Sequence, residues 1–275
     1  MSGRPLLDLT GQHVLVIGGS RGIGAATAVM AARGGAAVSL TYREDRASAD
    51  RTVEAIAAVG GQALAVGMDV TDESSVVATI DQAVHDLGPL TGLVVSAGIF
   101  ADGWRPVPQT TREYWDQVMA TNLTGTFLAV RAAVPHLLSK GDDPLEPPTR
   151  AGLGAGGSDR SVVIITSTAG QRGAGGNAAY ATSKGAQITL MRSLAQEFAG
   201  DAIRVNCVAP AWTDTDTAAD LIDRFGREEI VANCPLGRVG HPDDAAGACC
   251  YLLSDLASYV TGSTLTVDGG QDMRG

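Results

Sequence analysis

The stretch HVLVIGGSRGIG, residues 13–24, joins a short β-branched run to a turn rich in glycine, and a helical pattern over 23–33 follows it. Such a turn lets backbone amides approach a phosphate closely, and the start of the helix adds free N–H groups and a partial positive charge. The spacing is G-x-x-x-G-x-G, not the usual G-x-G-x-x-G, so a glycine turn without a ligand stays open as the alternative. We expect dinucleotide contacts in this turn at Gly18, Ser20, Arg21, Gly22, Ile23 and Gly24.

The alternation of strand and helix continues along most of the chain. Near-continuous apolar runs, typical of strands buried on both faces, occur at 13–17, 37–41, 63–66, 92–96, 162–166, 203–208 and 264–267. Helical patterns lie at 23–33, 47–59, 73–87, 112–139, 178–198, 217–231 and 243–253. This order predicts the α/β class. We expect one doubly wound, Rossmann-like domain over residues 1–275, with a seven-stranded parallel sheet and helices on both faces.

One segment, residues 140–160, interrupts this alternation. It is dense in glycine, proline and aspartate, so it can neither continue the preceding helix nor join a central strand. The composition predicts a flexible surface insertion before the fifth strand. A lid over the site and a tolerated surface loop are both consistent with it.

Charge and composition exclude several classes of partner. The 275 residues carry 20 Lys+Arg against 30 Asp+Glu, a net charge of −10, which argues against binding nucleic acid or an anionic membrane. No apolar stretch approaches the ~20 residues of a spanning helix, and the N-terminus lacks the pattern of a signal peptide. The four cysteines form no C-x-x-C pair, which predicts reduced thiols in a cytoplasmic protein. The scattered histidines predict no metal site.

The end of the second strand separates NAD from NADP. NAD sites place an acidic residue there for the ribose 2′-hydroxyl, whereas NADP sites place an arginine near the 2′-phosphate. Here the strand ends in Tyr42 and Arg43, and Arg21 of the glycine turn would reach the same phosphate. The pattern therefore favours NADP(H) over NAD(H). The alternative is that both arginines are solvated and pair with Glu44 and Asp45.

Asp69 and Val70 follow the third strand, at the edge where a nucleotide base would lie. The Asp69 carboxylate suits a hydrogen bond to the base edge. It would equally suit the cap of the helix that begins at Glu73.

Tyr180 and Lys184 carry the strongest chemical signal. They are four residues apart in a helical stretch, so both side chains share one face. An ammonium beside a phenol favours the phenolate and lowers a pKa whose ordinary value is ~10. Ser167 ends the fifth strand, at the edge where open parallel sheets bind ligands, and Asn122 lies in the long helical stretch before it.

Together these features resemble the short-chain dehydrogenase/reductase family from Gly11 to Gly270. The family's Asn–Ser–Tyr–Lys tetrad maps onto Asn122, Ser167, Tyr180 and Lys184 without a gap. Its glycine motif appears at 17–24, its N-N-A-G turn at 95–98, and its P-G segment at 210–211.

Three positions depart from the family pattern. Ile17 replaces a threonine and Val95-Ser96 replace two asparagines, which removes side-chain bonds that brace the strand turns. Ala211 replaces a glycine and narrows the backbone freedom beside the nicotinamide.

The resemblance implies a mechanism. NADPH delivers hydride to a carbonyl carbon while Tyr180 protonates the oxygen, and Ser167 holds and polarises that oxygen. Lys184 lowers the tyrosine pKa and binds the nicotinamide ribose, and Asn122 holds a proton-relaying water. The resemblance implies further cofactor contacts at Tyr180, Lys184, Ser96, Ala97, Gly98, Pro210, Ala211, Thr213 and Thr215.

The same resemblance places the substrate pocket after the fourth, fifth and sixth strands, at 98–108, 168–177 and 211–230. Arg172 is a possible anion contact there. The candidate apolar walls, which ordinary packing of a lid helix explains equally well, are Trp104, Trp212, Leu221, Ile222 and Phe225.

Three functions remain. Residues 235–238 resemble β-ketoacyl carrier-protein reductases, but the stretches 134–137 and 194–197, where such enzymes dock an acidic carrier, are poor in cations. A free small-molecule ketone or aldehyde is therefore favoured, and a β-ketoacyl carrier or thioester substrate is the second reading. A non-catalytic NADP sensor is the third, and the complete tetrad argues against it. The family also implies a homotetramer or homodimer.

Overall fold

A seven-stranded parallel sheet with the order β3-β2-β1-β4-β5-β6-β7 forms the middle of the protein. This is seen in a computed structural model that describes residues 7–100, 105–138 and 160–272. The strands are β1 (His13–Ile17), β2 (Ala37–Tyr42), β3 (Ala63–Gly67), β4 (Gly92–Val95), β5 (Arg160–Ile165), β6 (Ile203–Pro210) and β7 (Thr264–Val267). The predicted α/β fold with seven parallel strands is confirmed.

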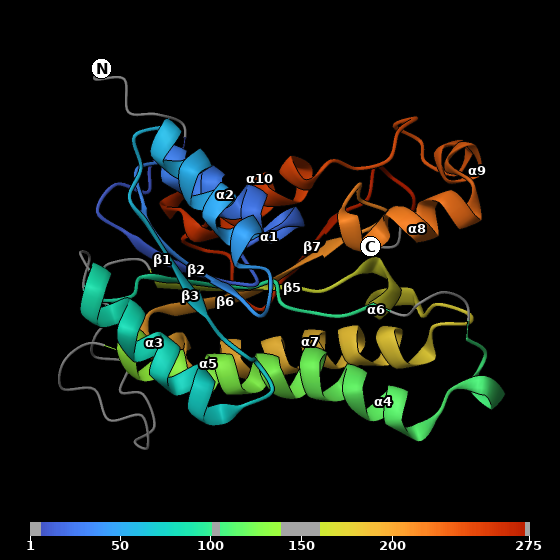
Figure 1. Ribbon diagram of the computed structural model, residues 1–275, viewed down its shortest axis with the longest axis horizontal. Coiled ribbons are helices and arrows are strands. Elements are labelled where there is room, and N and C mark those ends of the chain that lie inside the picture. The colour runs from blue at the N-terminus through green and yellow to red at the C-terminus, as the bar shows by residue number, and fades with distance from the viewer. Residues whose placement is uncertain (1–6, 101–104, 139–159, 273–275) are drawn as a thin grey trace.

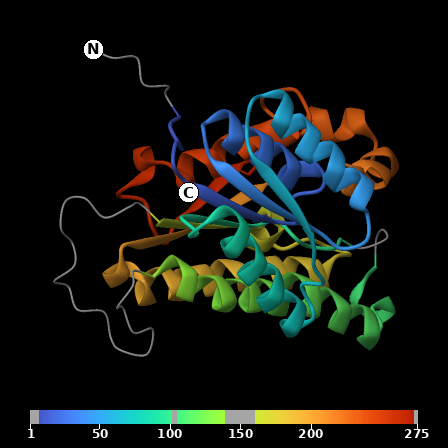
Figure 2. The same ribbon diagram turned by 60° about the vertical axis from the view of Figure 1, so that its left-hand side comes forward.

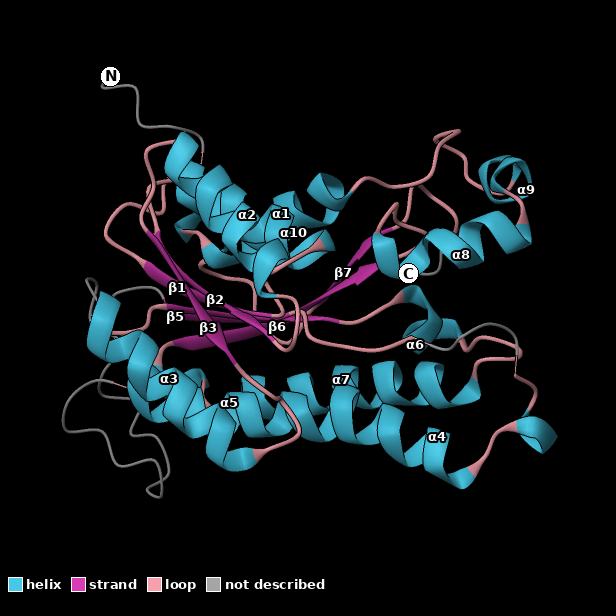
Figure 3. Cartoon of the chain, viewed as in Figure 1, coloured by secondary structure: helices cyan, strands magenta, loops and turns pink. Residues whose placement is uncertain are grey.

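Helices cover both faces of this sheet (Figures 1 and 3). One face carries α1 (Gly22–Arg33), α2 (Arg46–Ala58) and α10 (Pro242–Leu253). The other carries α3 (Glu73–Leu87), α4 (Arg112–Val118), α5 (Gly125–Leu137) and α7 (Ala178–Glu197). Three further helices lie beyond the carboxyl ends of the strands: α6 (Thr168–Arg172), α8 (Asp216–Phe225) and α9 (Arg227–Ala232). Turned by 60°, the molecule still shows the sheet between two helical layers (Figure 2).

The core divides between the two faces because side chains alternate along a strand. Leu15 and Ile17 of β1 pack with the α3, α5 and α7 layer. Val14 and Val16 pack with α1 and α10. All four are fully buried, which explains why central strands of this sheet read as continuous apolar runs in the sequence.

Two of the predicted helices are interrupted. The pattern over 112–139 gives α4 and α5 separated by η2, a π-helical segment over Met119–Thr124. The pattern over 217–231 gives α8 and α9, because Gly226 between them has a φ of 83°, which ends a right-handed helix. Three 3₁₀ turns complete the described chain: η1 (Val107–Gln109), η4 (Ala199–Asp201) and η5 (Asp255–Ala257).

The predicted insertion at 140–160 lies outside the described residues except for Arg160, which belongs to β5 and not to a loop. Among the described helices, none combines the length and the apolar character needed to cross a membrane.

Candidate active site

The loops that the sequence singled out meet where the strand order reverses. The chain continues from β1 to β2 on one side and returns to β4 on the other side of β1, which is the position where open α/β sheets bind ligands. The glycine turn and the Ser96–Gly98 loop face each other there. A Cβ at Gly18 would lie 2.7 Å from the amide nitrogen of Ala97, so only glycine fits between the two loops.

The glycine turn is held from both ends. A Cβ at Gly24 would overlap the carbonyl oxygen of Gly18, so the first turn of α1 packs directly against the loop. Thr41 braces the other end, since its Oγ1 accepts from the Gly18 amide at 3.0 Å and its carbonyl accepts from the Gly19 amide at 3.0 Å. Thr41 therefore supplies a brace for the turn although the family's threonine is replaced by Ile17.

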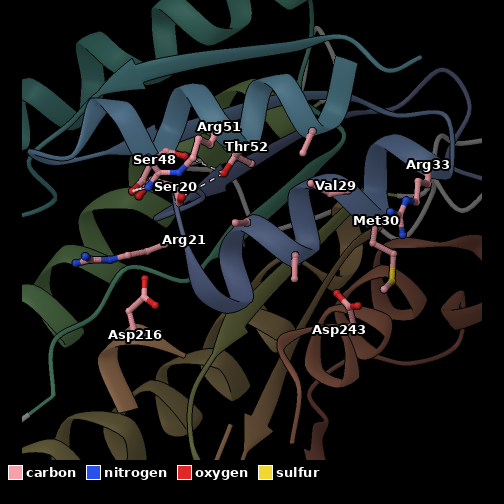
Figure 4. Close-up of a pocket in the computed structure, with 13 residues that line it drawn as sticks. Ser20, Arg21, Val29, Met30, Arg33, Ser48, Arg51, Thr52, Asp216 and Asp243 are labelled. Atoms are coloured by element: carbon pink, nitrogen blue, oxygen red, sulfur yellow. Dashed lines mark hydrogen bonds between the residues drawn. The ribbon is translucent and has the colours of Figure 1, made fainter. Parts of the chain in front are cut away.

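A groove of about 380 Å³ begins at this turn and runs along α1 between α2 and the first turns of α8 and α10 (Figure 4). Ser20 and Arg21 lie at one end, where the Thr52 hydroxyl donates to the Ser20 carbonyl at 3.2 Å. Arg33 lies at the far end. Within the described part of the chain, the Arg21 guanidinium makes no hydrogen bond or ion pair.

The second predicted arginine is partly engaged. Arg43 pairs with Glu44 at 3.1 Å, as the alternative interpretation expected, and its Nε lies 3.9 Å from the carboxylate of Asp69. Asp45 does not join this pair. It caps α2 by accepting from the Ser48 amide at 2.9 Å.

Asp69 is not the cap of the next helix, because Asp72 fills that position and accepts from the amides of Ser74 and Ser75. The Asp69 carboxylate instead accepts from the amide and hydroxyl of Thr71, which lowers its pKa. Its neighbour Val70 is buried and packs so tightly on α5 that a Cβ at Gly125 would lie 2.8 Å from it.

Tyr180, Lys184 and Ser167 come together at the carboxyl edge of β5. The Ser167 side chain lies beside the Tyr180 hydroxyl and lowers its pKa, and Ser167 accepts from the Ala169 amide at 3.1 Å as the cap of α6. The Lys184 ammonium donates to the Ile165 carbonyl at 2.9 Å and lies 5.7 Å from the centre of the Tyr180 ring. The Phe100 ring packs edge-on against Tyr180 at a centroid distance of 4.4 Å.

The pKa values of this pair differ from the sequence-based expectation. Burial raises the pKa of Tyr180 to about 12, and the Ser167 side chain only partly offsets the shift. Burial also lowers the pKa of Lys184 to about 8. The prediction that Lys184 lowers the phenol pKa is therefore wrong for the protein by itself, where desolvation disfavours both charged forms.

Asn122 lies next to the other three but uses its side chain to hold the backbone. Its amide oxygen accepts from the Ile99 amide at 2.8 Å, while its amide nitrogen donates to the Ile99 carbonyl and the Ser183 hydroxyl, both at 3.0 Å. Gly98 sits between Asn122 and Lys184, because a Cβ there would lie 3.3 Å from the first and 3.5 Å from the second.

The loop after β6 closes the cleft from the opposite side. A Cβ at Gly22 would lie 3.3 Å from the methyl group of Thr215, so this loop reaches the glycine turn. The buried Thr213 hydroxyl donates to the Ala211 carbonyl at 3.1 Å. Ala211 itself continues the sheet, with its amide donating to the Val267 carbonyl at 3.1 Å.

On the substrate side, the structure separates packing residues from exposed ones. Leu221 and Ile222 lie on the buried side of α8, whereas Phe225 at the end of α8 is 40% exposed and its ring centre lies 5.5 Å from that of Trp212. Trp104 lies outside the described residues.

Arg172, the candidate anion contact, already has a carboxylate beside it. Its Nε lies 3.6 Å from Asp272, whose side chain is only 9% exposed. The C-terminal segment and α6 are therefore joined at this side of the site.

Sequence reasoning missed several residues that shape the site: Thr41, Phe100, Ser183, Gln187 and Asp272. Their contacts are made with segments remote in the sequence. The one available signal was Gln187, a polar residue on the face of α7 that also carries Ile188 and Met191.

The chain is similar to known proteins over almost its whole length. A family model described as Enoyl-(Acyl carrier protein) reductase matches residues 17–272. The chain is 40% identical over 245 residues to a Xanthobacter autotrophicus protein named inactive 2-(S)-hydroxypropyl-CoM dehydrogenase 2, covering 87% of this chain and 96% of that protein. It is 34% identical over 262 residues to the 3-oxoacyl-[acyl-carrier-protein] reductase FabG of Staphylococcus aureus, covering 95% and 98%. The structure of a short-chain type dehydrogenase/reductase from Mycobacterium marinum matches with a TM-score of 0.86 at 31% identity, covering 98% of both chains.

Proposed function

This chain belongs to the short-chain dehydrogenase/reductase family, an oxidoreductase family acting on alcohol and carbonyl groups, and from that premise we propose that it uses NADPH to reduce a small-molecule ketone or aldehyde to the alcohol. The observation that carries the proposal is the gathering of Tyr180, Ser167 and Lys184 at the carboxyl edge of the sheet, with the Lys184 ammonium 5.7 Å from the centre of the Tyr180 ring.

The cleft fits a dinucleotide. Cβ atoms at Gly18 and Gly24 would collide with the Ala97 amide and the Gly18 carbonyl, so these glycines let the turn close tightly against the neighbouring loop and α1. No side chain caps the start of α1, so its first amides are available to a pyrophosphate. The proposed contacts are Gly18 to Gly24 for the pyrophosphate, Asp69 and Val70 for the base, and Ser96 to Gly98 with Thr213 and Thr215 for the nicotinamide half. When bound, NADPH supplies the hydride.

The protein's own groups supply the proton and the orientation. Ser167 holds the substrate oxygen, and the Tyr180 hydroxyl transfers its proton to that oxygen as negative charge develops there. The Lys184 ammonium then stabilises the Tyr180 phenolate until the phenol is reprotonated. Asn122 keeps the Ile99 backbone, and with it the loop that carries Phe100, in place against Tyr180.

The test of this proposal is NADPH oxidation with a panel of ketones, aldehydes and a β-ketoacyl thioester. We expect Tyr180→Phe to reduce turnover by about 10²–10⁴-fold while NADPH still binds, because a general acid contributes on that order. Tyr251→Phe, at a partly exposed position on α10, is the matched control and should keep wild-type turnover. Binding by the wild-type protein without any turnover would support the sensor alternative and overturn the proposal.

NADP preference rests on Arg21 and Arg43 at the adenosine end of the cleft. Arg21 lies at the mouth of the groove without an ion pair among the described residues, and Arg43 is exposed beside Asp69. A guanidinium binds a dianionic phosphate through charge-assisted hydrogen bonds.

Substituting Arg21 or Arg43 by alanine should raise the KM for NADPH at least about tenfold each, since a lost charged hydrogen bond is worth ~1.5–3 kcal/mol. The KM for NADH should change little. Arg33→Ala, at the far end of the same groove, is the control that should leave both values unchanged. Equal loss with NADPH and NADH would contradict the assignment.

A β-ketoacyl carrier or thioester substrate is the second candidate, and the similarity to the Staphylococcus aureus reductase supports it. The thioester in the substrate panel separates it from a free carbonyl compound. A kcat/KM for the thioester far above that for every free ketone would make it the preferred reading.

We also infer a homo-oligomer working in the cytoplasm. Phe127 on α5 is 44% exposed, and Leu256 and Tyr259 beyond α10 are 60% and 102% exposed, so two separate surfaces present large apolar groups to solvent. All four cysteines are free thiols, which agrees with a reducing compartment. Light scattering should give the mass of a dimer or tetramer, and a stable monomer would refute this inference.

A further inference from the structure

Gln187 is a fully buried amide in the interface between α7 and the segment η2. It lies on α7, three positions after Lys184, with an exposed fraction of 0%. The buried residues of α7 include Ser183 and Lys184 before it and the apolar Ile188 and Met191 after it. A polar side chain at such a position needs a reason, because burying an amide costs free energy that burying a methionine does not.

The Gln187 amide nitrogen reaches across the interface to the π-helical segment η2. It donates to the carbonyl oxygen of Asn122 at 2.6 Å and to the hydroxyl of Thr126 at 2.8 Å. The Thr126 hydroxyl in turn donates to the same Asn122 carbonyl at 2.7 Å. Two side chains thus bind one backbone oxygen inside a segment that departs from regular α-helical bonding.

Stability does not explain this arrangement. The other atom of the amide, Gln187 Oε1, is buried with no hydrogen-bond partner in the described structure, which costs on the order of 1–3 kcal/mol. A methionine would fill the same space without that penalty. What the glutamine adds, and methionine cannot, is donation to the Asn122 carbonyl.

Two chains of contacts connect the segment η2, which Gln187 holds, to Tyr180. Asn122 fixes both backbone groups of Ile99, and the next residue, Phe100, packs its ring on Tyr180. Asn122 also donates to the Ser183 hydroxyl, which donates to the Tyr180 carbonyl at 2.7 Å. The position of Asn122 is therefore transmitted both to the ring and to the backbone of Tyr180.

We propose that Gln187 is a positioning residue for the reaction: it fixes the π-helical segment through the Asn122 carbonyl, so that Asn122 and Phe100 hold Tyr180 in line with Ser167. The inference rests on the role proposed for Tyr180. π-Helical turns inside α-helices are often found at functional sites, and a misplacement of about 1 Å can cost 10²-fold in rate.

The central experiment compares Gln187→Met with Thr126→Val, their double variant, and Thr126→Ser as the conservative control. We expect Gln187→Met to lower kcat by about 10- to 100-fold while the KM for NADPH stays within about twofold of wild type. Thr126→Val should also lower kcat, whereas Thr126→Ser, which keeps the hydroxyl, should have the wild-type kcat. Because both side chains act on one carbonyl, the double variant should lose less than the product of the two single losses.

Two measurements separate positioning from general destabilisation. Asn206 is an equally buried amide on β6 that bonds Val260 and Ser263, outside the site. Asn206→Leu should lower the melting temperature and leave the kcat of the folded enzyme unchanged. Gln187→Met should also shift the Tyr180 phenolate titration, read by tyrosinate absorbance in the absence of substrate.

The outcomes are distinguishable from those of the proposed function. If wild-type protein shows no Tyr180-dependent turnover, the proposed function fails, while the titration shift still reports whether Gln187 positions Tyr180. If folded Gln187→Met keeps wild-type kcat and an unshifted titration, the positioning role is wrong. Should Gln187→Met fail to fold, an unchanged kcat in Thr126→Val overturns the proposal instead.

Discussion

Tyr180 shows how burial and charge compete at a single side chain. The phenol is surrounded by Phe100, Ser167 and Lys184, and burial raises its pKa to about 12 in the protein by itself. The neighbouring ammonium does not reverse this, because the same burial lowers the pKa of Lys184 to about 8 and its charge is directed at the Ile165 carbonyl. A phenol of this kind holds its proton until further positive charge arrives.

Tyrosinate absorbance measures how strongly burial holds the Tyr180 proton. The difference between wild type and Tyr180→Phe should show a phenolate that forms only near pH 12 in the free protein. Adding NADP⁺, whose oxidised ring is positive, should move that titration below ~10, because a nearby cation favours the phenolate. A titration already below ~10 in the free protein would contradict the dominance of burial.

Two helices differ in whether they can accept an added Cβ at a glycine. Gly24 lies in the first turn of α1, where an added Cβ would overlap the Gly18 carbonyl. Gly247 lies inside α10, where an added Cβ would meet nothing within 4 Å. The same substitution should therefore have opposite effects in the two helices.

We expect Gly24→Ala to lose at least about tenfold in NADPH affinity and to melt at a lower temperature, because α1 must move away from the glycine turn. Gly247→Ala should raise the free energy of unfolding by about 0.5–1 kcal/mol, the usual gain for alanine over glycine in a helix interior. Urea unfolding and NADPH titration of the two variants side by side check this. Similar behaviour of the two variants would show that the crowding at Gly24 is unimportant.

The stability of the whole protein depends on pH through a buried histidine at the end of the sheet remote from the site. His13 begins β1 and is buried, with Nδ1 2.7 Å from the Gly88 carbonyl and Nε2 2.8 Å from the Ser39 hydroxyl. It thereby ties β1 to β2 and to the loop before β4. Burial lowers its pKa below the ordinary 6.5, so the folded protein resists protonation there.

This gives a prediction for acid stability. The contribution of His13 is fully present above pH 6.5, the pKa of the unfolded chain. Below it, the unfolded state binds a proton that the folded state does not, so the free energy of unfolding falls by at most about 1.4 kcal/mol per pH unit until the folded-state pKa is reached. Urea unfolding between pH 7.5 and 5 should show this slope, and His13→Gln should lack it. His85→Gln, at an exposed position, should keep this slope. An equal slope in His13→Gln would show that His13 is not its cause.

The strand and helix order, and the gathering of the site at one edge, were predictable because their causes are local. Continuous apolar runs such as 13–17 indicate strands buried on both faces, and parallel strands joined by helices bring their carboxyl ends to one edge. The glycine turn and the spacing of Tyr180 and Lys184 belong to the same kind of short-range information. The interruption of the helix over 112–139 was not predictable, since no proline or glycine lies within η2.

Other features of the site depend on groups far apart in the chain and could not be predicted from the sequence. The residues around Asn122 in the sequence do not indicate that its carbonyl accepts a hydrogen bond from Gln187, because the two residues are 65 positions apart. The pairing of Arg172 with Asp272 likewise spans α6 and the C-terminal segment. The pKa values of Tyr180 and Lys184 follow from how completely the fold removes them from water. Periodicity and turn chemistry act over a few residues and so are readable from sequence, whereas desolvation and cross-helix hydrogen bonds exist only once the layers have packed.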